Sequence, residues 1–157
     1  MKQIELTRGY VATVDDADYE WLTSLGSWSA RETVDGRVYA QRAVGRTTEQ
    51  MHRVIAGHAL VDHINGDGLD NRRSNLRPAT VTQNNRNARR RKDNRSGFKG
   101  VTRQASGLWR ARITVDGLQI RLGTFDAPED AARAYDAAAI HHFGEFARLN
   151  FPTKEPA

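Results

Sequence analysis

An acidic residue and a histidine lie next to each other in the segment VDHINGDGLDNRRSNLR, which covers residues 61–77. Hydrolysis of a phosphodiester needs a general base to take a proton from water and an electrophile to stabilise the charge on phosphorus. The imidazole of His63 titrates in a range that suits a general base. Consecutive strand residues point to opposite sides, so Asp62 can hold a metal ion while His63 faces the phosphate. The pair predicts metal-assisted hydrolysis; the alternative is a hydrogen-bonded structural histidine.

The residues around this pair indicate which metal ion would bind. An EF-hand calcium loop counted from Asp62 needs an oxygen ligand at its third position and a glutamate at its twelfth, where Ile64 and Arg73 stand. The chain has no cysteine, which excludes cysteine-bound zinc and disulfides. Oxygen-only ligands suit a hard ion, so we expect Mg²⁺, with Mn²⁺ as the alternative. The helix predicted to follow offers three asparagines as a second oxygen ligand: Asn84, Asn85 and Asn87.

Positive charge is concentrated in the same part of the chain. The net charge is +5, and residues 61–95 hold nine basic side chains against four acidic ones. Within them, RNARRRK at residues 86–92 places five cations in seven positions. Such a run suits a polyanion, whose counterions are released on binding, or equally a solvated linker. The arginines that we expect at DNA phosphates here are Arg72, Arg73, Arg77, Arg86, Arg89, Arg90 and Arg91.

The composition limits the class of protein. The 157 residues allow one ordinary domain or two small ones, and a hydrophobic fraction of 38% is too small for one large core. No apolar run approaches the roughly 18 residues that span a membrane. The N-terminus, MKQIELTRGY, lacks the apolar stretch of a secretory signal. We therefore expect a cytoplasmic protein that does not associate with membranes.

Short strands and helices are predicted on both sides of the opening segment. Alternating apolar residues between turn residues predict four strands before it, at residues 2–6, 10–14, 28–32 and 37–44. Helical spacing predicts two helices, at residues 15–26 and 47–57. The second would begin at Thr47 or Thr48. From the opening segment onward the order is strand, loop, strand near 75–78, and a helix from about Thr80 that Thr82 can cap.

A domain boundary is predicted at KDNRS, because this polar segment has no apolar anchor. The predicted divisions are a first domain at 1–91, a linker at 92–96, a second domain at 97–152 and a tail at 153–157. The second domain is predicted to contain three strands, at 98–104, 108–115 and 118–125. One helix would follow at 126–144, with Asp126 and Glu129 as its capping box and Gly144 at its end.

Charge also separates within this second domain. In its middle strand Trp109, Ala111 and Ile113 alternate with Arg110 and Arg112, which gives one apolar and one cationic face. Residues 96–124 carry five cations and one acid, whereas residues 125–157 carry three cations and six acids. The pattern favours a sheet that faces nucleic acid, with the acidic helix kept away by repulsion. The alternative is an ordinary solvated sheet face.

Residues 51–87, MHRVIAG followed by VDHINGDGLDNRRSNLRPATVTQNNRN, resemble the HNH nuclease family in its phage and intron homing-endonuclease branch. The resemblance implies a ββα-metal fold in which His63 is the general base and Asp62 and Asn84 bind the metal ion. It implies that Asn75 braces the loop and that Asn87 contacts DNA or caps the site. The third motif position is asparagine instead of histidine, a variant that occurs in this branch. For His52 we prefer packing between helix and sheet to a supporting role near the phosphate.

The C-terminal part resembles a second family. The GFKGVTRQ segment, LGTF, the EDAARAYDAAAI helix and the closing LNFP are similar to the plant ethylene-response-factor (AP-two) DNA-binding domain. That family lays a three-stranded sheet in the major groove. The resemblance implies DNA contacts on the face or its edges from Lys99, Arg103, Trp109, Arg110, Arg112 and Arg121. Thr102, Gln104, Ser106 and Arg121 depart from the plant pattern, so the plant target sequence does not carry over.

Together these features predict an α+β protein with a ββα-metal nuclease domain, followed by a small three-stranded antiparallel sheet packed on one helix. We expect a site-directed, homing-type DNA endonuclease that nicks double-stranded DNA as a monomer, in a bacterial or phage-infected cell. One alternative is a DNA-binding transcriptional regulator whose HNH motif is inactive. Another is a nuclease directed at RNA.

Overall fold

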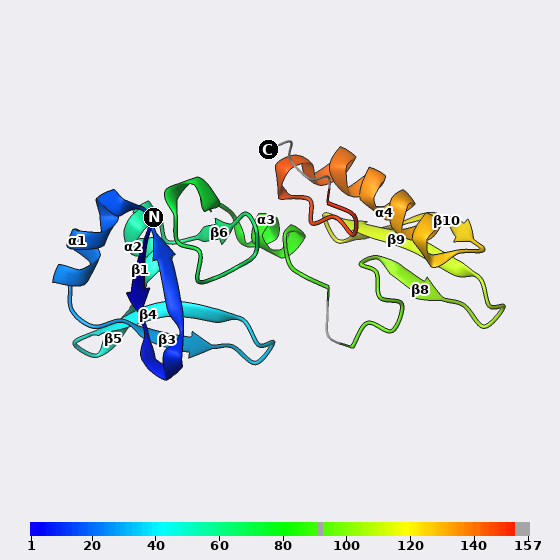
Figure 1. Cartoon of the computed structure of the whole chain (residues 1–157). Coiled ribbons are helices and arrows are strands. Elements are labelled where there is room, and N and C mark those ends of the chain that lie inside the picture. Colours follow the sequence, from blue (N-terminus) through cyan, green and yellow to red (C-terminus); the bar gives the residue numbers. More distant parts are fainter. Residues whose placement is uncertain (91–92, 153–157) are drawn as a thin grey trace. The chain divides into compact units, whose positions relative to one another are not determined.

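The computed structural model describes residues 1–90 and 93–152 of the chain (Figure 1). The chain divides into two compact units, Met1–Asn84 and Asn85–Ala157. Both units combine antiparallel sheets with a few helices, as predicted for the α+β class. Within the described residues, no helix has the length and apolar character needed to cross a membrane.

Three small antiparallel sheets form the first unit. One pairs β1 (Lys2–Glu5) with β2 (Val11–Val14). The next has the order β3 (Ser29–Glu32), β4 (Val38–Val44) and β5 (Thr47–Gln50). The last pairs β6 (Val61–His63) with β7 (Leu76–Pro78). The helical segments are η1 (Thr7–Gly9), α1 (Asp16–Ser24), α2 (Met51–Ala56), η2 (Arg73–Asn75) and the start of α3 (Val81–Arg86).

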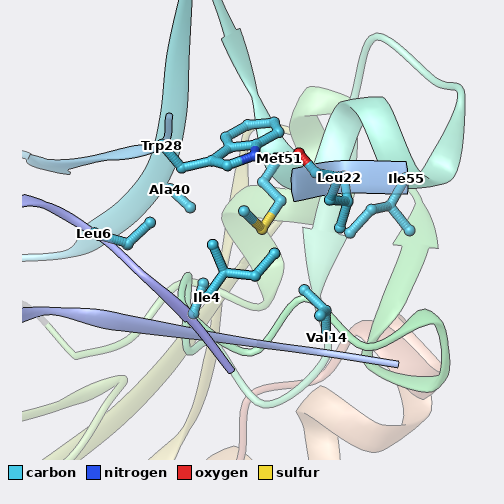
Figure 2. Packing of buried hydrophobic residues seen from close by; sticks show 9 residues of the cluster. Ile4, Leu6, Val14, Leu22, Trp28, Ala40, Met51 and Ile55 are labelled. Atoms are coloured by element: carbon cyan, nitrogen blue, oxygen red, sulfur yellow. Dashed lines mark hydrogen bonds between the residues drawn. The ribbon is translucent and has the colours of Figure 1, made fainter. Parts of the chain in front are cut away.

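The core of this unit joins β1, β2, α1, β4 and α2. Figure 2 shows side chains from these elements converging, with Met51 among Trp28, Leu22 and Ile4. Met51 and Leu22 are fully buried, and the indole Nε1 of Trp28 donates to the carbonyl oxygen of Leu22 at 2.9 Å. This core fixes the start of α2 and therefore the position of the neighbouring His52.

The prediction of one helix over 47–57 is wrong in its first part. Thr47–Gln50 form β5, which pairs with β4, and only Met51–Ala56 are helical. The guanidinium of Arg42 binds the carboxylate of Glu49 across these two strands at 2.8 Å. The predicted end of the helix is confirmed, because Gly57 has a left-handed φ of 67° and caps it. Pairing with a neighbouring strand overrides helical propensity over these four residues.

A three-stranded sheet covered by one helix forms the second unit. The strands are β8 (Val101–Arg103), β9 (Trp109–Val115) and β10 (Leu118–Phe125), in the order β10-β9-β8. The helix is α4 (Pro128–Phe143), and the short η3 (Gly144–Phe146) follows it. The predicted Asp126 cap is wrong, because Ala127 is the N-cap residue and makes no side-chain cap. Pro128 instead begins the helix with a preset φ.

Small residues let α4 lie close to the sheet. Ala111 of β9 and Ala131 and Ala132 of α4 are all fully buried. Gly100 is required here, since a Cβ at this position would lie 1.9 Å from the ring of Tyr135. The carboxylate of Asp136 then holds the closing segment by accepting hydrogen bonds from the backbone of Asn150 and Phe151 at 2.8 and 2.9 Å.

The division between the units falls within α3, seven residues before the predicted linker. The ammonium of Lys99 donates to the carbonyl oxygens of Arg86 and Ala88 at 2.6 and 2.8 Å. These bonds lie within the second unit and hold the end of α3. Arg91 at the end of the predicted first domain, Lys92 at the start of the predicted linker, and the predicted tail at 153–157 lie outside the described residues.

Candidate functional site

The Asp–His pair of the opening segment lies on β6, whose three residues are all buried. Asp62 is 4% exposed and His63 is 5% exposed. In the register with β7, Asp62 is opposite Arg77 and His63 is opposite Leu76. The two side chains have different neighbours, because Asp62 contacts Arg77 while His63 packs among polar and aromatic groups. One strand therefore places an acid and an imidazole at adjacent positions in separate environments.

Asn75 ties together the loop that follows β6. Its Oδ1 accepts a hydrogen bond from the backbone N–H of Asn65 at 3.0 Å. Its Nδ2 donates to Asn65 Oδ1 at 3.1 Å and to the carbonyl oxygen of Asp70 at 2.7 Å. The backbone N–H of Ile64 donates to the carbonyl oxygen of Asn75 at 2.9 Å. A residue that braces the loop would make contacts of this kind.

The far end of the loop is attached to β2. The backbone of Thr13 donates to Leu69 and accepts from Asn71, both at 2.8 Å. Asn71 is fully buried, and its Oδ1 lies 3.4 Å from Nε2 of His63. The prediction did not include Asn71, although it is part of the quoted segment. The tie that buries it is to a strand near the N-terminus, which local sequence does not reveal.

Two aromatic side chains pack against the imidazole of His63. The rings of His52 and His63 meet edge to face with their centroids 4.8 Å apart, and the Tyr39 ring is 5.8 Å from His63. Gly68 leaves room for Tyr39, since a Cβ there would lie 2.5 Å from its ring. His52 is 4% exposed, and its Nδ1 has no hydrogen-bond partner among the described residues. Tyr39 is a second residue that the prediction missed.

Burial keeps both histidines of this cluster neutral. Burial lowers the pKa of His52 to about 3, because a charged imidazole would lose its hydration at this position and would be repelled by a charged His63. It also lowers the pKa of His63, while the contact with Asn71 acts in the opposite direction. At neutral pH the imidazole of His63 can therefore accept a proton.

The three arginines predicted to hold phosphates beside this site each bind a carboxylate within the first unit. Arg72 binds Asp70 at 2.6 Å. Arg73 binds Asp18 at 2.7 Å. Arg77 binds Asp62 through Nη2 at 2.7 Å and through Nε at 3.0 Å, both to Oδ2. The first pair lies within the loop, the second joins the loop to α1, and the third joins β7 to β6.

Asn84 lies on α3, which is held at its start by a reciprocal pair of hydrogen bonds. Gln83 N–H donates to Thr80 Oγ1 at 3.2 Å, and Thr80 N–H donates to Gln83 Oε1 at 2.8 Å. This is a capping-box pattern on Thr80 rather than the predicted Thr82. The helix ends at Arg86. Asn84 is half-buried, Asn85 is exposed, and Asn87 is buried.

The donor chemistry of the first unit fits a hard divalent ion. Asp62 contributes a carboxylate and Asn84 a carboxamide oxygen, and both are ligand types that Mg²⁺ prefers. Among residues 1–90 and 93–152 no group of three or more His, Cys, Asp or Glu side chains could hold a metal ion. An ion held by the two predicted ligands, Asp62 and Asn84, would therefore complete its coordination with water and with substrate oxygens.

The helix-free face of the β8–β10 sheet is cationic. Arg110 lies opposite Thr102 on β8 and Thr124 on β10, and Arg112 lies opposite Arg121. A bulge at Leu122 keeps Thr124 on the same face as Arg121, whose Nη2 donates to Thr124 Oγ1 at 2.8 Å. Arg110 Nε and Thr102 Oγ1 are buried atoms that have no hydrogen-bond partner among the described residues.

The other predicted DNA contacts of the second unit have different surroundings. The guanidinium of Arg103 lies 5.7 Å from the ring of Trp109. Arg103 and Trp109 are opposite each other in the register of β8 and β9, on the face of the sheet that packs against the core. The ammonium of Lys99 donates hydrogen bonds to backbone carbonyls, and burial lowers its pKa to about 8. Arg86 binds Asp116 at 3.0 Å and stacks on Phe143. Arg89 and Arg90 are exposed, and Arg91 lies outside the described residues.

Comparisons with known proteins find two kinds of similarity. No protein-family model matches the chain. Over 96 residues, or 61% of the chain, it is 37% identical to an uncharacterized HNH endonuclease of Acanthamoeba polyphaga mimivirus. Over 62 residues, or 38% of the chain, it is 48% identical to an ethylene-responsive transcription factor of Arabidopsis thaliana. Over 57 residues it is 47% identical to an AP2/ERF and B3 domain-containing protein of rice.

Each of these similarities is partial. The chain spans 49% of the viral protein, 33% of the Arabidopsis factor and 16% of the rice protein. Part of the chain is thus similar to an HNH endonuclease, and part is similar to plant DNA-binding domains. The expected similarities to HNH endonucleases and to ethylene-response-factor domains are both found among known proteins, whereas the homing branch stays a prediction.

Proposed function

We propose that the chain is a metal-dependent DNA endonuclease of the HNH kind that carries its own DNA-binding domain. The observation that carries this proposal is the order of β6, a braced loop, β7 and α3, with Asp62 and His63 buried side by side on β6. The similarity to the viral HNH endonuclease supports it. The cationic sheet face and the similarity to ethylene-responsive factors support DNA as the substrate.

His63 is the general base in this proposal. The Oδ1 of Asn71 lies near Nε2, which favours the tautomer whose proton is on Nε2. Nδ1 is then the nitrogen that takes a proton from the attacking water. At 3.4 Å the contact is long, and such contacts tighten when substrate binds. Packing by His52 and Tyr39 holds the ring in place during the transfer.

Asp62 and Asn84 would hold the divalent ion, which we propose to be Mg²⁺ with Mn²⁺ as the alternative. When bound, the ion supplies a Lewis acid that stabilises the charge on the leaving 3′ oxygen. The chain contributes one such site, so a monomer would nick one strand. Site-directed cleavage of the homing type would follow from tethering this site to the cationic sheet, which raises its local concentration on DNA.

The first test is removal of the metal ion. We expect the full chain to convert supercoiled plasmid to relaxed circles with Mg²⁺, to lose this activity completely in EDTA, and to regain it when excess Mg²⁺ is added. Gel electrophoresis separates the relaxed and linear products, so one assay also distinguishes nicking from double-strand cleavage. Absence of cleavage on several DNA sequences, with both Mg²⁺ and Mn²⁺, would contradict the proposal.

A DNA-binding regulator without nuclease activity is the second candidate. It is favoured by the similarity to proteins named as transcription factors and by the cationic sheet. The outcome that contradicts the enzyme, DNA binding without cleavage, is the outcome expected for this candidate. The plasmid assay therefore separates the two functions.

The sheet face gives a prediction that is independent of cleavage. We expect Arg112→Gln to weaken binding to a DNA duplex and to reduce the slope of log affinity against log salt by about 1, because one phosphate contact is lost. Arg133→Gln is the matched control, since Arg133 is exposed on α4 of the same unit. Fluorescence anisotropy over a range of salt concentrations measures both quantities. Equal effects of the two changes would argue against the sheet as the DNA-binding surface.

A further inference from the structure

Arg77 and Asp62 form a buried ion pair inside the candidate active site. They lie opposite each other in the register of β6 and β7, and their side chains are only 10% and 4% exposed. Nη2 and Nε of Arg77 both donate to Oδ2 of Asp62, at 2.7 and 3.0 Å. Charge-assisted hydrogen bonds of this kind are among the stronger contacts in proteins. The carboxylate expected to bind a cation is therefore already held by one.

Arg77 differs in this respect from its two neighbours in the sequence. Arg72 and Arg73 also bind carboxylates, but their side chains are 34% and 58% exposed. Their partners, Asp70 and Asp18, are not the residues proposed to bind the metal ion. Of these three arginines, Arg77 alone combines deep burial with a bond to the proposed metal ligand.

The charge of the site follows from this pairing. Asn84 is neutral, and Asp62 and Arg77 balance each other. A divalent ion that approaches Asp62 meets a net neutral pair and the repulsion of the guanidinium, whose effect is strong in a buried environment. A DNA phosphate that enters the site adds negative charge and oxygen ligands for the ion.

We propose that Arg77 sets the metal affinity of the site by competing with the ion for Asp62, so that the ion binds weakly until DNA is present. The inference rests on the proposed function, because it takes Asp62 as a metal ligand. Arg77 is a positioning residue that holds the carboxylate in the absence of metal. Linkage then requires that metal and DNA strengthen each other's binding by the same factor. Tight binding of the ion is thereby confined to the complex with DNA.

The test measures binding of Mn²⁺ to the full-length chain by the electron paramagnetic resonance signal of the unbound ion. Without DNA, we expect Arg77→Met to bind Mn²⁺ at least about tenfold more tightly than the wild type, since one nearby unit charge is removed. Arg77→Lys keeps the charge and should stay within about threefold of the wild type. Arg73→Met is the matched control, because it exposes a different carboxylate, and its Mn²⁺ affinity should not change.

A second measurement covers the case in which Arg77→Met folds poorly, since it leaves a buried carboxylate without its partner. We expect this variant to melt at a lower temperature than the wild type and to recover with Mn²⁺, which replaces the missing positive charge. The wild type should gain much less from Mn²⁺ without DNA. A variant that Mn²⁺ neither stabilises nor refolds, or that binds Mn²⁺ no more tightly than the wild type, overturns the role of Arg77.

DNA-dependent binding separates this inference from the proposed function. In the His63→Ala background, which leaves the duplex uncut, added DNA should tighten Mn²⁺ binding at least about tenfold. Adding Asp62→Asn to this background should abolish that gain. If Asp62→Asn has no effect, Asp62 is not a ligand and the proposed metal site itself fails. If the gain depends on Asp62 but Arg77→Met changes nothing, only the inference about Arg77 fails.

Discussion

Replacing His63 by alanine should lower the rate of DNA cleavage by about 10²–10⁴-fold, the usual contribution of a positioned general base. The imidazole is 5% exposed, lies between Asn71 and two aromatic rings, and has a pKa lowered by burial. All of these features suit a group that accepts a proton at neutral pH. Single-turnover cleavage of supercoiled plasmid in Mg²⁺ measures the rate without interference from product release.

His58→Ala is the matched control for this change. His58 is an exposed histidine of the same unit, and its loss should leave the cleavage rate unchanged. Both variants should bind DNA with the affinity of the wild type, since the sheet face lies in the other unit. A His63→Ala rate within about threefold of the wild type would exclude His63 as the base, because general-base catalysis contributes far more than that.

The dependence of the rate on pH tests the same assignment. Burial lowers the pKa of His63, so the imidazole stays neutral at pH values where an exposed histidine is already charged. Cleavage should therefore persist at mildly acidic pH and decline as the pH falls through this lowered pKa. A decline centred above the ordinary histidine value of about 6.5 would contradict the assignment.

Replacing Asn75 by alanine should have the largest effect on stability. The side chain is 6% exposed and makes hydrogen bonds with Asn65 N–H, Asn65 Oδ1 and the carbonyl oxygen of Asp70. Each bond lost leaves a partner unsatisfied, at a cost of about 1–3 kcal/mol for a buried group. We therefore expect the free energy of unfolding of the first unit to fall by about 3–5 kcal/mol. Urea denaturation followed by tryptophan fluorescence measures this change.

Asn85→Ala provides the comparison for Asn75→Ala. Asn85 is an exposed asparagine on α3, so its replacement should change the free energy of unfolding by less than about 0.5 kcal/mol. Because the loop follows the strand that carries Asp62 and His63, Asn75→Ala should also reduce cleavage under conditions where the protein is still folded. A stability equal to that of Asn85→Ala would show that the loop holds its shape without this side chain.

Local signals predicted the elements that depend on local residues. The strands β3 and β4 follow from alternating apolar residues between turn residues, and the end of α2 follows from Gly57. The three strands and the helix of the second unit follow from alternation and helical spacing. In each case, the residues that specify the element lie within it or beside it.

The elements and contacts that the sequence did not predict depend on residues far apart in the chain. The local sequence of Thr47–Gln50 did not distinguish a strand from a helix. These residues become β5 because they pair with β4. The residue type of His63 was enough to predict a role in the site. Its neighbours Tyr39 and Asn71 are placed by packing and by hydrogen bonds to β2, which the local sequence does not reveal. The pair of Arg73 and Asp18 joins residues that only the tertiary fold brings together. Charge alone predicted phosphate contacts, and it could not show that these arginines already have carboxylate partners.

The ammonium of Lys99, which binds the carbonyl oxygens of Arg86 and Ala88, has a consequence for how such a chain can be recombined. A recombination crossover within the polar segment 92–96 would keep α3 from the original chain. It would replace Lys99 together with the rest of the C-terminal domain. The carbonyl oxygens of Arg86 and Ala88 would then lose their donor unless the incoming domain carried a lysine at the same place. Chimaeras made by exchanging C-terminal domains should therefore retain function more often when the exchanged piece begins before residue 85 or when its lysine is matched.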